Sequence, residues 1–266
     1  MVPNLVKSDQ QYSFGWGGAY EGDSSLDFLD GVHYSKNIPE FFEKLEEATL
    51  SNGYRGMAAN LMMADTSGNI AYQMAVPIPI RKDLTPYLGC RVLDGRTTEF
   101  DWSEELVPLE ELPRSINPEK GFLSNANNRQ APDHAAYDYG STNMSTGRSI
   151  RIDELIRDGI AKGKKFTPED MIEYQLDNMD VFARNMLPKV VSLAQSMSRE
   201  LSKDDQVHLK AALQYYQDWS GAMDEDSIAA SIHMHYSMAL YKSFFHKQIA
   251  EGEEERMLIS DNYPFP

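Results

Sequence analysis

The chain has 266 residues, of which 41% are apolar and 25% are charged, and this length and composition suit a globular protein with a sizeable core. Its net charge of -16 argues against a nucleic-acid partner, because affinity for a phosphate backbone comes largely from lysine and arginine side chains. The single cysteine, Cys90, allows no internal disulfide and no cysteine-rich metal site. The sequence has no run of about 18 apolar residues, so it predicts no membrane span.

The first half of the chain has the patterns of a mixed helix and strand region. Residues 37–50 have a proline in the first turn and apolar residues at helical spacing, which predicts an amphipathic helix. Residues 60–80 contain two β-compatible runs around the turn composition Asp65–Asn69, which predicts a β-hairpin, and its apolar strands suggest burial on both faces. Residues 81–120 are rich in proline, glycine and acidic residues and favour an irregular excursion.

The second half of the chain has helical patterns. Thr167, Pro168 and Asp170 are the N-cap, first-turn proline and third-position acid of a helix start, and apolar residues follow at helical spacing as far as Met179. Pro188 is expected to interrupt or restart this helix. Two further helices are predicted within 204–219 and 226–248, so we expect a helical layer.

Two common classes of catalytic motif are missing. The sequence has no Gly-x-Ser-x-Gly elbow and no phosphate-binding P-loop, so a serine hydrolase of the elbow type and a P-loop nucleotide-binding protein are excluded. His233 and His235 are two positions apart, whereas a metal-binding pair on one helix face needs a spacing of four. We interpret them as surface or helix-packing histidines.

The segment GFLSNANNRQ, residues 121–130, places three asparagines and an arginine directly after apolar residues. Asparagines at this kind of position commonly form turns. Alternatively, one carboxamide N–H₂ group donates to an oxygen that becomes negative during acyl transfer. Composition alone does not choose between these alternatives.

Several separated blocks follow one another along the sequence. They are NLMMADTSGNIAYQ (60–73), FDW (100–102), LEELP (109–113), INPEKGFLSNANNR (116–129), TGRSIRIDELI (146–156), TPEDMIEYQLDNMDVFARNMLPKVV (167–191) and WSG (219–221). These blocks resemble the penicillin acylase (penicillin amidase) family and occur in that family's order, and the resemblance extends from about Tyr12 to about Phe245. Two blocks depart from the family pattern: Ala71 replaces a glycine in the hairpin block, and Ser220 replaces the aspartate of a W-D-G block.

The resemblance implies an α+β fold, namely a fragment of the four-layer αββα sandwich of N-terminal nucleophile hydrolases. The chain would be a partial acylase domain from the central part of the large subunit, with a sheet and site region at about 12–150 and a helical layer at about 151–250. Family members cleave the acyl group from amines such as a β-lactam nucleus or an acyl-homoserine lactone. Their nucleophile is an N-terminal serine freed by autoproteolysis, and the position that matches it would lie upstream of residue 1. This fragment alone is therefore expected to be inactive.

The resemblance also implies roles for four residues. Asn127 matches the asparagine of the oxyanion hole, and Arg148 matches the arginine that holds this asparagine and the amine of the nucleophile in place. Ala59 matches a position that lines the acyl pocket. Asp138 matches one ligand of a structural calcium whose other aspartates would lie upstream, which makes it a weak metal site here. No cofactor is required for catalysis.

The implied partners are a small-molecule acyl amide and the missing upstream part or small subunit of the same precursor, with no membrane partner. A periplasmic or secreted location is implied for the full-length parent. A different hypothesis is a non-catalytic pseudoenzyme or binding protein that retains the acylase scaffold. An unrelated acidic α+β binding domain would require the ordered blocks to be accidental.

Overall fold

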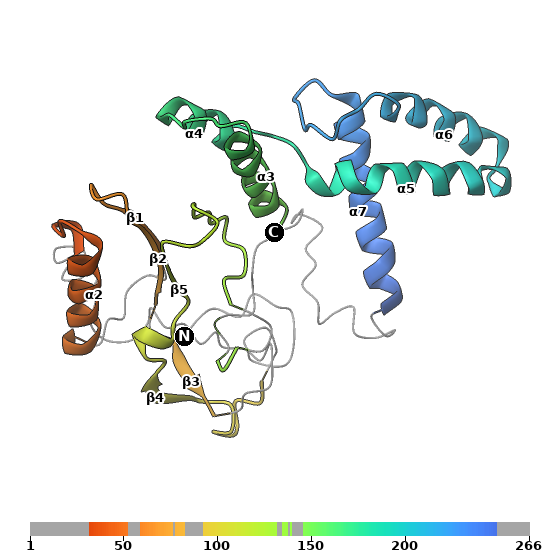
Figure 1. Ribbon diagram of the computed structural model, residues 1–266. Helices are drawn as coiled ribbons and strands as arrows, with labels where there is room; N and C mark the ends of the chain where they lie inside the picture. The colour runs from red at the N-terminus through yellow and green to blue at the C-terminus, as the bar shows by residue number, and fades with distance from the viewer. Residues whose placement is uncertain are drawn as a thin grey trace. The chain divides into compact units, whose positions relative to one another are not determined.

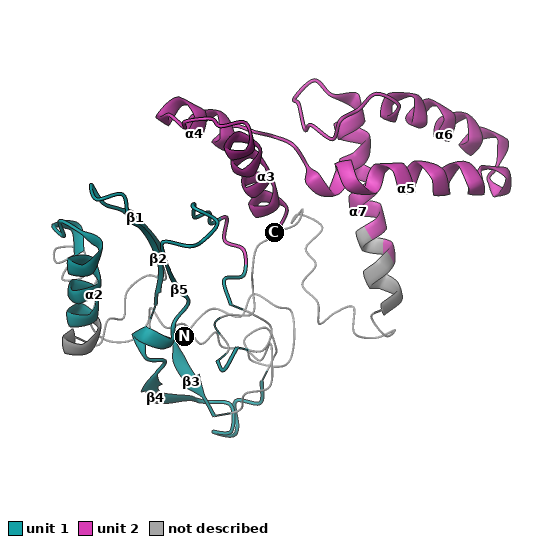
Figure 2. Ribbon diagram, in the orientation of Figure 1, with its two compact units in different colours: residues 1–125, 129–143 teal, residues 126–128, 144–266 magenta. Residues whose placement is uncertain are grey.

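The structure, a computed structural model, describes residues 32–52, 59–76, 78–82, 93–131, 135–137, 139 and 146–248. The chain divides into two compact units (Figure 2). Unit 1 comprises residues 1–125 and 129–143, and unit 2 comprises residues 126–128 and 144–266. The described strands lie in unit 1 and most of the described helices in unit 2, so the predicted α+β class is confirmed (Figure 1).

Over its described residues, unit 1 contains one long helix and two small antiparallel sheets. The larger sheet has the strand order β1-β2-β5, and the smaller one pairs β3 with β4. The elements are α2 (Ile38–Asn52), β1 (Ala59–Ala64), β2 (Ile70–Ala75), β3 (Pro79–Arg81), β4 (Trp102–Leu106), the 3-10 turn η3 (Leu109–Glu111) and β5 (Arg114–Ile116).

The hairpin predicted from residues 60–80 is formed by β1 and β2. The two strands pair antiparallel from Ala59 opposite Ala75 to Ala64 opposite Ile70. The side chain of Asp65 holds the turn, because its Oδ1 accepts hydrogen bonds from the backbone N–H groups of Ser67 at 2.9 Å and Asn69 at 3.0 Å. The aspartate and asparagine of the turn composition therefore act as turn-forming side chains.

The prediction that both hairpin strands are buried on both faces holds only for β2. In β1, half-buried and exposed residues alternate, so Leu61 and Met63 face the protein while Met62 is 45% exposed. β2 lies between two strands and is largely buried on both faces, whereas β1 is at the edge of the described sheet. Apolar composition alone does not distinguish an edge strand from a central one.

The prediction that residues 81–120 are irregular is wrong in part. β4 pairs with β3, and β5 pairs antiparallel with β2 in the larger sheet, with Ala71 opposite Ile116 and Gln73 opposite Arg114. β5 is three residues long, too short for an alternating pattern to be recognised in the sequence.

A buried polar contact joins β2 and β5. Gln73 is fully buried, its amide donates to the carbonyl of Met74 at 2.8 Å, and its Oε1 accepts from Nε of Arg114 at 2.5 Å. The guanidinium of Arg114 also lies 4.4 Å from the centre of the Phe42 ring on α2. Both ends of the buried carboxamide are thus hydrogen-bonded, as burial of a polar group requires.

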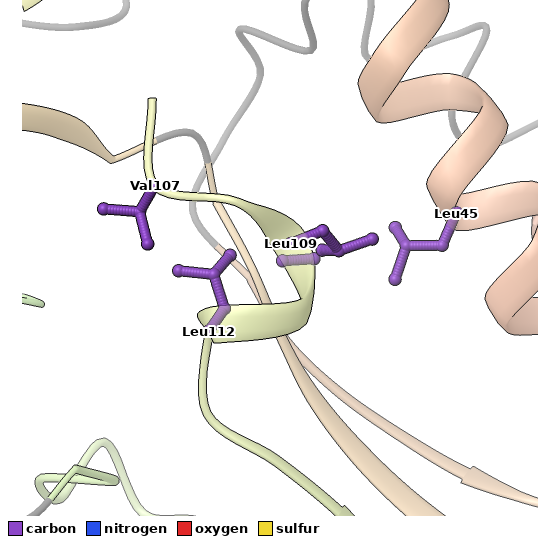
Figure 3. Packing of buried hydrophobic residues seen from close by; sticks show 5 residues of the cluster. Leu45, Val107, Leu109 and Leu112 are labelled. Carbon is purple, nitrogen blue, oxygen red and sulfur yellow. The ribbon is translucent and has the colours of Figure 1, made fainter. Parts of the chain in front are cut away.

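The core of unit 1 lies between α2, the sheet and the segment around η3. Leu45 reaches from α2 toward Leu109, and Val107 and Leu112 lie on either side of the 3-10 turn (Figure 3). Asn37 begins α2, because its Oδ1 accepts from the backbone N–H of Glu40 at 2.9 Å. The helix predicted for residues 37–50 is therefore confirmed.

Unit 2 is helical over its described residues after 146. Among these helices, none combines the length and the apolar composition that crossing a membrane requires. They are α3 (Gly147–Ala161), α4 (Pro168–Gln175), α5 (Val181–Met197), the 3-10 turn η4 (Ser198–Glu200), α6 (Lys203–Tyr216) and α7 (Ile228–Gln248).

The helix start predicted at Thr167 is confirmed, but the helix ends earlier than expected. Thr167 and Asp170 form a capping box, and α4 stops at Gln175. A new helix, α5, begins after Asp180, whose side chain accepts from the first backbone N–H groups of that helix, and Pro188 lies inside α5. The predicted break at Pro188 is therefore wrong, because the N-cap at Asp180 decides where the helix starts.

The connections before α5 and after α6 are joined to each other. The backbone N–H of Asp180 donates to the carbonyl of Gly221 at 3.0 Å, and that of Met223 donates to the carbonyl of Asn178 at 3.0 Å. His233 on α7 packs against this junction with its ring centre 5.3 Å from that of Trp219, and burial lowers its pKa. The interpretation of His233 as a packing histidine is confirmed.

Candidate active site

The asparagine singled out by the sequence lies in a three-residue piece, 126–128, that belongs to unit 2. Ala126 is buried at 5% exposure, whereas Asn127 is exposed. The backbone of Asn127 has a φ of 59°, in the left-handed region. Asparagine occupies this region more readily than most residues with a side chain. The backbone therefore favours asparagine or glycine at this position.

Arg148, in the first turn of α3, fixes the carboxamide of Asn127. Its Nη2 donates to the backbone carbonyl of Ala126 at 2.7 Å and to Oδ1 of Asn127 at 3.1 Å. The two side chains are 21 positions apart in sequence, and the expectation that they lie within hydrogen-bonding reach is confirmed. The carbonyl of Ala126 was missed by the sequence analysis, because a backbone acceptor leaves no mark in the residue types.

This contact also determines which way the carboxamide faces. A guanidinium group has only donors, so the atom of Asn127 that faces Arg148 is the oxygen. The N–H₂ group lies on the opposite side of the carboxamide. Asn127 therefore presents its two N–H donors away from Arg148.

The neighbouring asparagine has a different part in the loop. Oδ1 of Asn128 accepts from the backbone N–H of Ala126 at 3.2 Å, which is a local contact over two residues. The turn-forming interpretation of this segment therefore applies to Asn128. The oxyanion role of Asn127 and the positioning role of Arg148 agree with the geometry and stay predictions.

The other two predicted site residues lie elsewhere. Ala59 is the first residue of β1 in unit 1, half-buried and opposite Ala75. The next residue, Asn60, accepts a hydrogen bond from the hydroxyl of Tyr72, whose pKa is raised to about 12 by burial. The acyl-pocket role of Ala59 stays a prediction. Asp138 lies outside the described residues, and within the described ranges no group of three or more His, Cys, Asp or Glu side chains is arranged to hold a metal ion.

Comparison with known proteins shows the family of the chain as a whole. The sequence model of the family described as penicillin amidase matches residues 3–264. The chain belongs to the penicillin amidase family. A penicillin amidase relative, penicillin G acylase of Escherichia coli, is 27% identical over 160 residues, which cover 58% of this chain and 17% of the relative.

Two further relatives are named after different substrates, one after acyl-homoserine lactones and the other after penicillin. An acyl-homoserine lactone acylase of Pseudomonas putida is 27% identical over 140 residues, covering 53% of this chain and 16% of the relative. A penicillin acylase 2 proenzyme of a Pseudomonas species is 24% identical over 221 residues, covering 83% of this chain and 26% of the relative. The chain thus spans about a sixth to a quarter of the length of these relatives.

The fold agrees with membership of the penicillin amidase family. The structure of a thermostable penicillin G acylase from Alcaligenes faecalis matches with a TM-score of 0.56 and 22% identity, over 88% of this chain and 40% of that chain. The chain therefore has part of the fold of that N-terminal nucleophile hydrolase, and the resemblance inferred from the sequence blocks is confirmed.

Proposed function

We propose that this chain is the central part of the large subunit of an acylase that hydrolyses the amide bond between an acyl group and an amine. The observation that carries the proposal is the hydrogen bond from Arg148 to Oδ1 of Asn127, at 3.1 Å, because it turns the N–H₂ group of Asn127 outward. Membership of the penicillin amidase family supports the reaction class.

In the proposed reaction the nucleophile is the N-terminal serine of the large subunit, outside this chain. A free α-amine has a pKa of about 8, and in this scheme it takes the proton from the serine hydroxyl as the oxygen attacks the acyl carbonyl. The carbonyl oxygen becomes negative in the tetrahedral intermediate. The same proton then passes to the leaving amine, and water hydrolyses the acyl-enzyme by the same steps.

Asn127 supplies a neutral donor to the oxyanion in this scheme. Such a donor contributes most when it is oriented in advance, since no reorganisation is then needed as the charge develops. Arg148 acts as a positioning residue, because its contact is with Oδ1 and with the carbonyl of Ala126. Its positive charge also polarises the carboxamide, which strengthens the N–H groups as donors.

The proposed substrates are small acyl amides, such as a β-lactam nucleus or a homoserine lactone that carries an acyl chain. The proposed protein partner is the remaining part of the same precursor, which supplies the nucleophile. Ala59 is proposed to line the acyl pocket, where its small side chain leaves space for a bulky acyl group. The proposed steps use no metal ion, and calcium at Asp138 would have a structural role only.

The test compares the product of the complete reading frame, including the sequence upstream of Met1, with the 266-residue chain. Both are assayed for release of amine from phenylacetyl amides and from N-acyl-homoserine lactones. We expect turnover by the self-processed product and none by the chain alone. Turnover by the chain alone would overturn the location of the nucleophile. A self-processed product without activity on either substrate class would support the pseudoenzyme alternative instead.

A further inference from the structure

The helix that carries Arg148 begins without a cap from the side chain of its N-cap residue. α3 follows Thr146, whose side chain makes no capping hydrogen bond. Its first turn contains no acidic residue. Neither a Thr146 side-chain cap nor an acidic first turn stabilises this helix start. Contacts that α3 makes further along therefore also bear on the position of Arg148.

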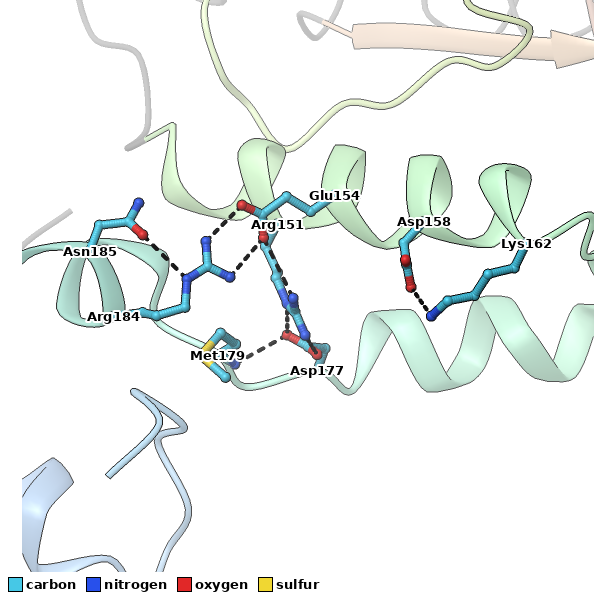
Figure 4. A network of polar contacts seen from close by, with 8 residues as sticks. All are labelled: Arg151, Glu154, Asp158, Lys162, Asp177, Met179, Arg184 and Asn185. Carbon is cyan, nitrogen blue, oxygen red and sulfur yellow. Dashed lines mark hydrogen bonds and ion pairs between the residues drawn. The ribbon is translucent and has the colours of Figure 1, made fainter. Parts of the chain in front are cut away.

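Those contacts are two two-pronged ion pairs on the following turns of α3 (Figure 4). Arg151 donates to Asp177 through Nε at 2.8 Å and Nη2 at 2.7 Å. Glu154 accepts from Arg184 through Nη1 at 2.9 Å and Nη2 at 2.7 Å. Arg151 also lies 3.5 Å from Glu154, so the two pairs form one network.

The network connects α3 to the start of α5, where buried residues lie. Asp177 follows α4, and Arg184 is in the first turn of α5. Next to them, Val181 and Ala183 are each 1% exposed. The side chains of the two pairs are between 20% and 37% exposed, so water screens these pairs less than it screens fully exposed ones. Parallel double hydrogen bonds also fix the angle between partners, which single contacts do not.

We infer that Arg151 and Glu154 are positioning residues for the proposed oxyanion hole, acting through α3 on Arg148 and thereby on Asn127. The inference rests on the proposed function. Residues 148, 151 and 154 are three apart, so each one neighbours the next on the surface of the helix. A rotation or shift of α3 moves the guanidinium of Arg148 relative to Asn127, and the N–H₂ group of Asn127 changes direction with it.

The same helix offers a matched control. Asp158 and Lys162 form an ion pair one turn beyond Glu154 (Figure 4). Asp158 is in α3, Lys162 is the residue that ends this helix, and both side chains are exposed. This pair spans one turn of the same helix and does not join α3 to α5. Asp158→Asn therefore changes one carboxylate on α3 and leaves the attachment of the helix intact.

The experiment uses the full-length, self-processed product and the variants Glu154→Gln, Arg184→Gln, their combination and Asp158→Asn. We expect Glu154→Gln to lower kcat by about 10- to 100-fold with KM changed by less than about twofold, because a misplaced donor weakens mainly the transition state. The double variant should lower kcat no further than the stronger single variant, since both remove the same link. Asp158→Asn should leave kcat unchanged.

A second measurement does not depend on activity. In the 266-residue chain, the side-chain N–H₂ resonances of Asn127, assigned by their loss in Asn127→Asp, should shift in Glu154→Gln and stay in place in Asp158→Asn. Unchanged resonances together with unchanged kcat in Glu154→Gln would overturn the inference. If the unsubstituted product hydrolyses no acyl amide, the proposed function fails, and the resonances alone decide whether Glu154 positions Asn127.

Discussion

Replacement of Asn127 by glycine tests the oxyanion donor without disturbing the backbone. The φ of 59° at this position costs glycine nothing, whereas alanine there pays about 1–2 kcal/mol of strain. Removing one oxyanion-hole donor typically costs about 3–4 kcal/mol of transition-state stabilisation, which corresponds to about 10² to 10³ in kcat. We therefore expect Asn127→Gly and Asn127→Ala to lose kcat equally, with little change in KM, while only the alanine variant loses about 1 kcal/mol more of folding stability.

The assay is steady-state hydrolysis of a phenylacetyl amide by the full-length processed variants, combined with urea unfolding of the 266-residue chain. The two measurements separate catalysis from strain. If Asn127→Gly turns over within about threefold of the unsubstituted enzyme, the carboxamide is a turn-former and the mechanism is wrong. If kcat follows the stability difference between the two variants, backbone conformation rather than the lost donor explains the effect.

Three further predictions concern unit 2. Gly221→Ala should destabilise more than Gly163→Ala in urea unfolding. Both have positive φ, which costs alanine about 1–2 kcal/mol, but a Cβ on Gly221 would also come within 3.1 Å of backbone in the first turn of α5, whereas one on Gly163 meets nothing within 4 Å; equal losses would contradict this packing. The hydrogen bond from Arg151 lowers the pKa of Asp177. The ion pair between the two residues therefore stabilises the fold above about pH 4, and this stabilisation is lost as the pH falls through the lowered pKa of Asp177. In Asp177→Asn the free energy of unfolding should fall less steeply as the pH is lowered below about 4. The same fall as in the unsubstituted chain would refute the link between this ion pair and stability. Thr167→Ala should cost about 1 kcal/mol and speed hydrogen exchange of the amides of α4, which has no buried residue to compensate for the lost cap; unchanged exchange would show that the cap is not needed.

The features that the sequence predicted well depend on neighbouring residues. The capping box at Thr167 and the turn at Asp65 both close within a few positions, so residue types alone indicate them. The break before α5 was assigned to Pro188 because proline usually ends a helix, but an aspartate eight positions earlier caps the new helix, and the proline is tolerated inside it.

The features that the sequence did not predict depend on distant partners. The alternating burial of β1 follows from its place at the edge of the described sheet, which is set by pairing and not by composition. The contact between Asn127 and Arg148 was expected only because the surrounding blocks resemble a known family. Its geometry needs α3 to be placed by ion pairs with residues 26 and 30 positions away, which local patterns do not reveal.

The buried amide of Gln73 has a consequence for the order in which unit 1 folds. The hairpin of β1 and β2 closes a short loop, whereas Arg114 reaches Gln73 across 41 positions. Closing a long loop costs more entropy than closing a short one, and the cost must be met before the contact is made. We therefore expect the hairpin to form early, with the carboxamide of Gln73 still hydrated. We expect β5 to add later, and water to leave this part of the sheet at that step.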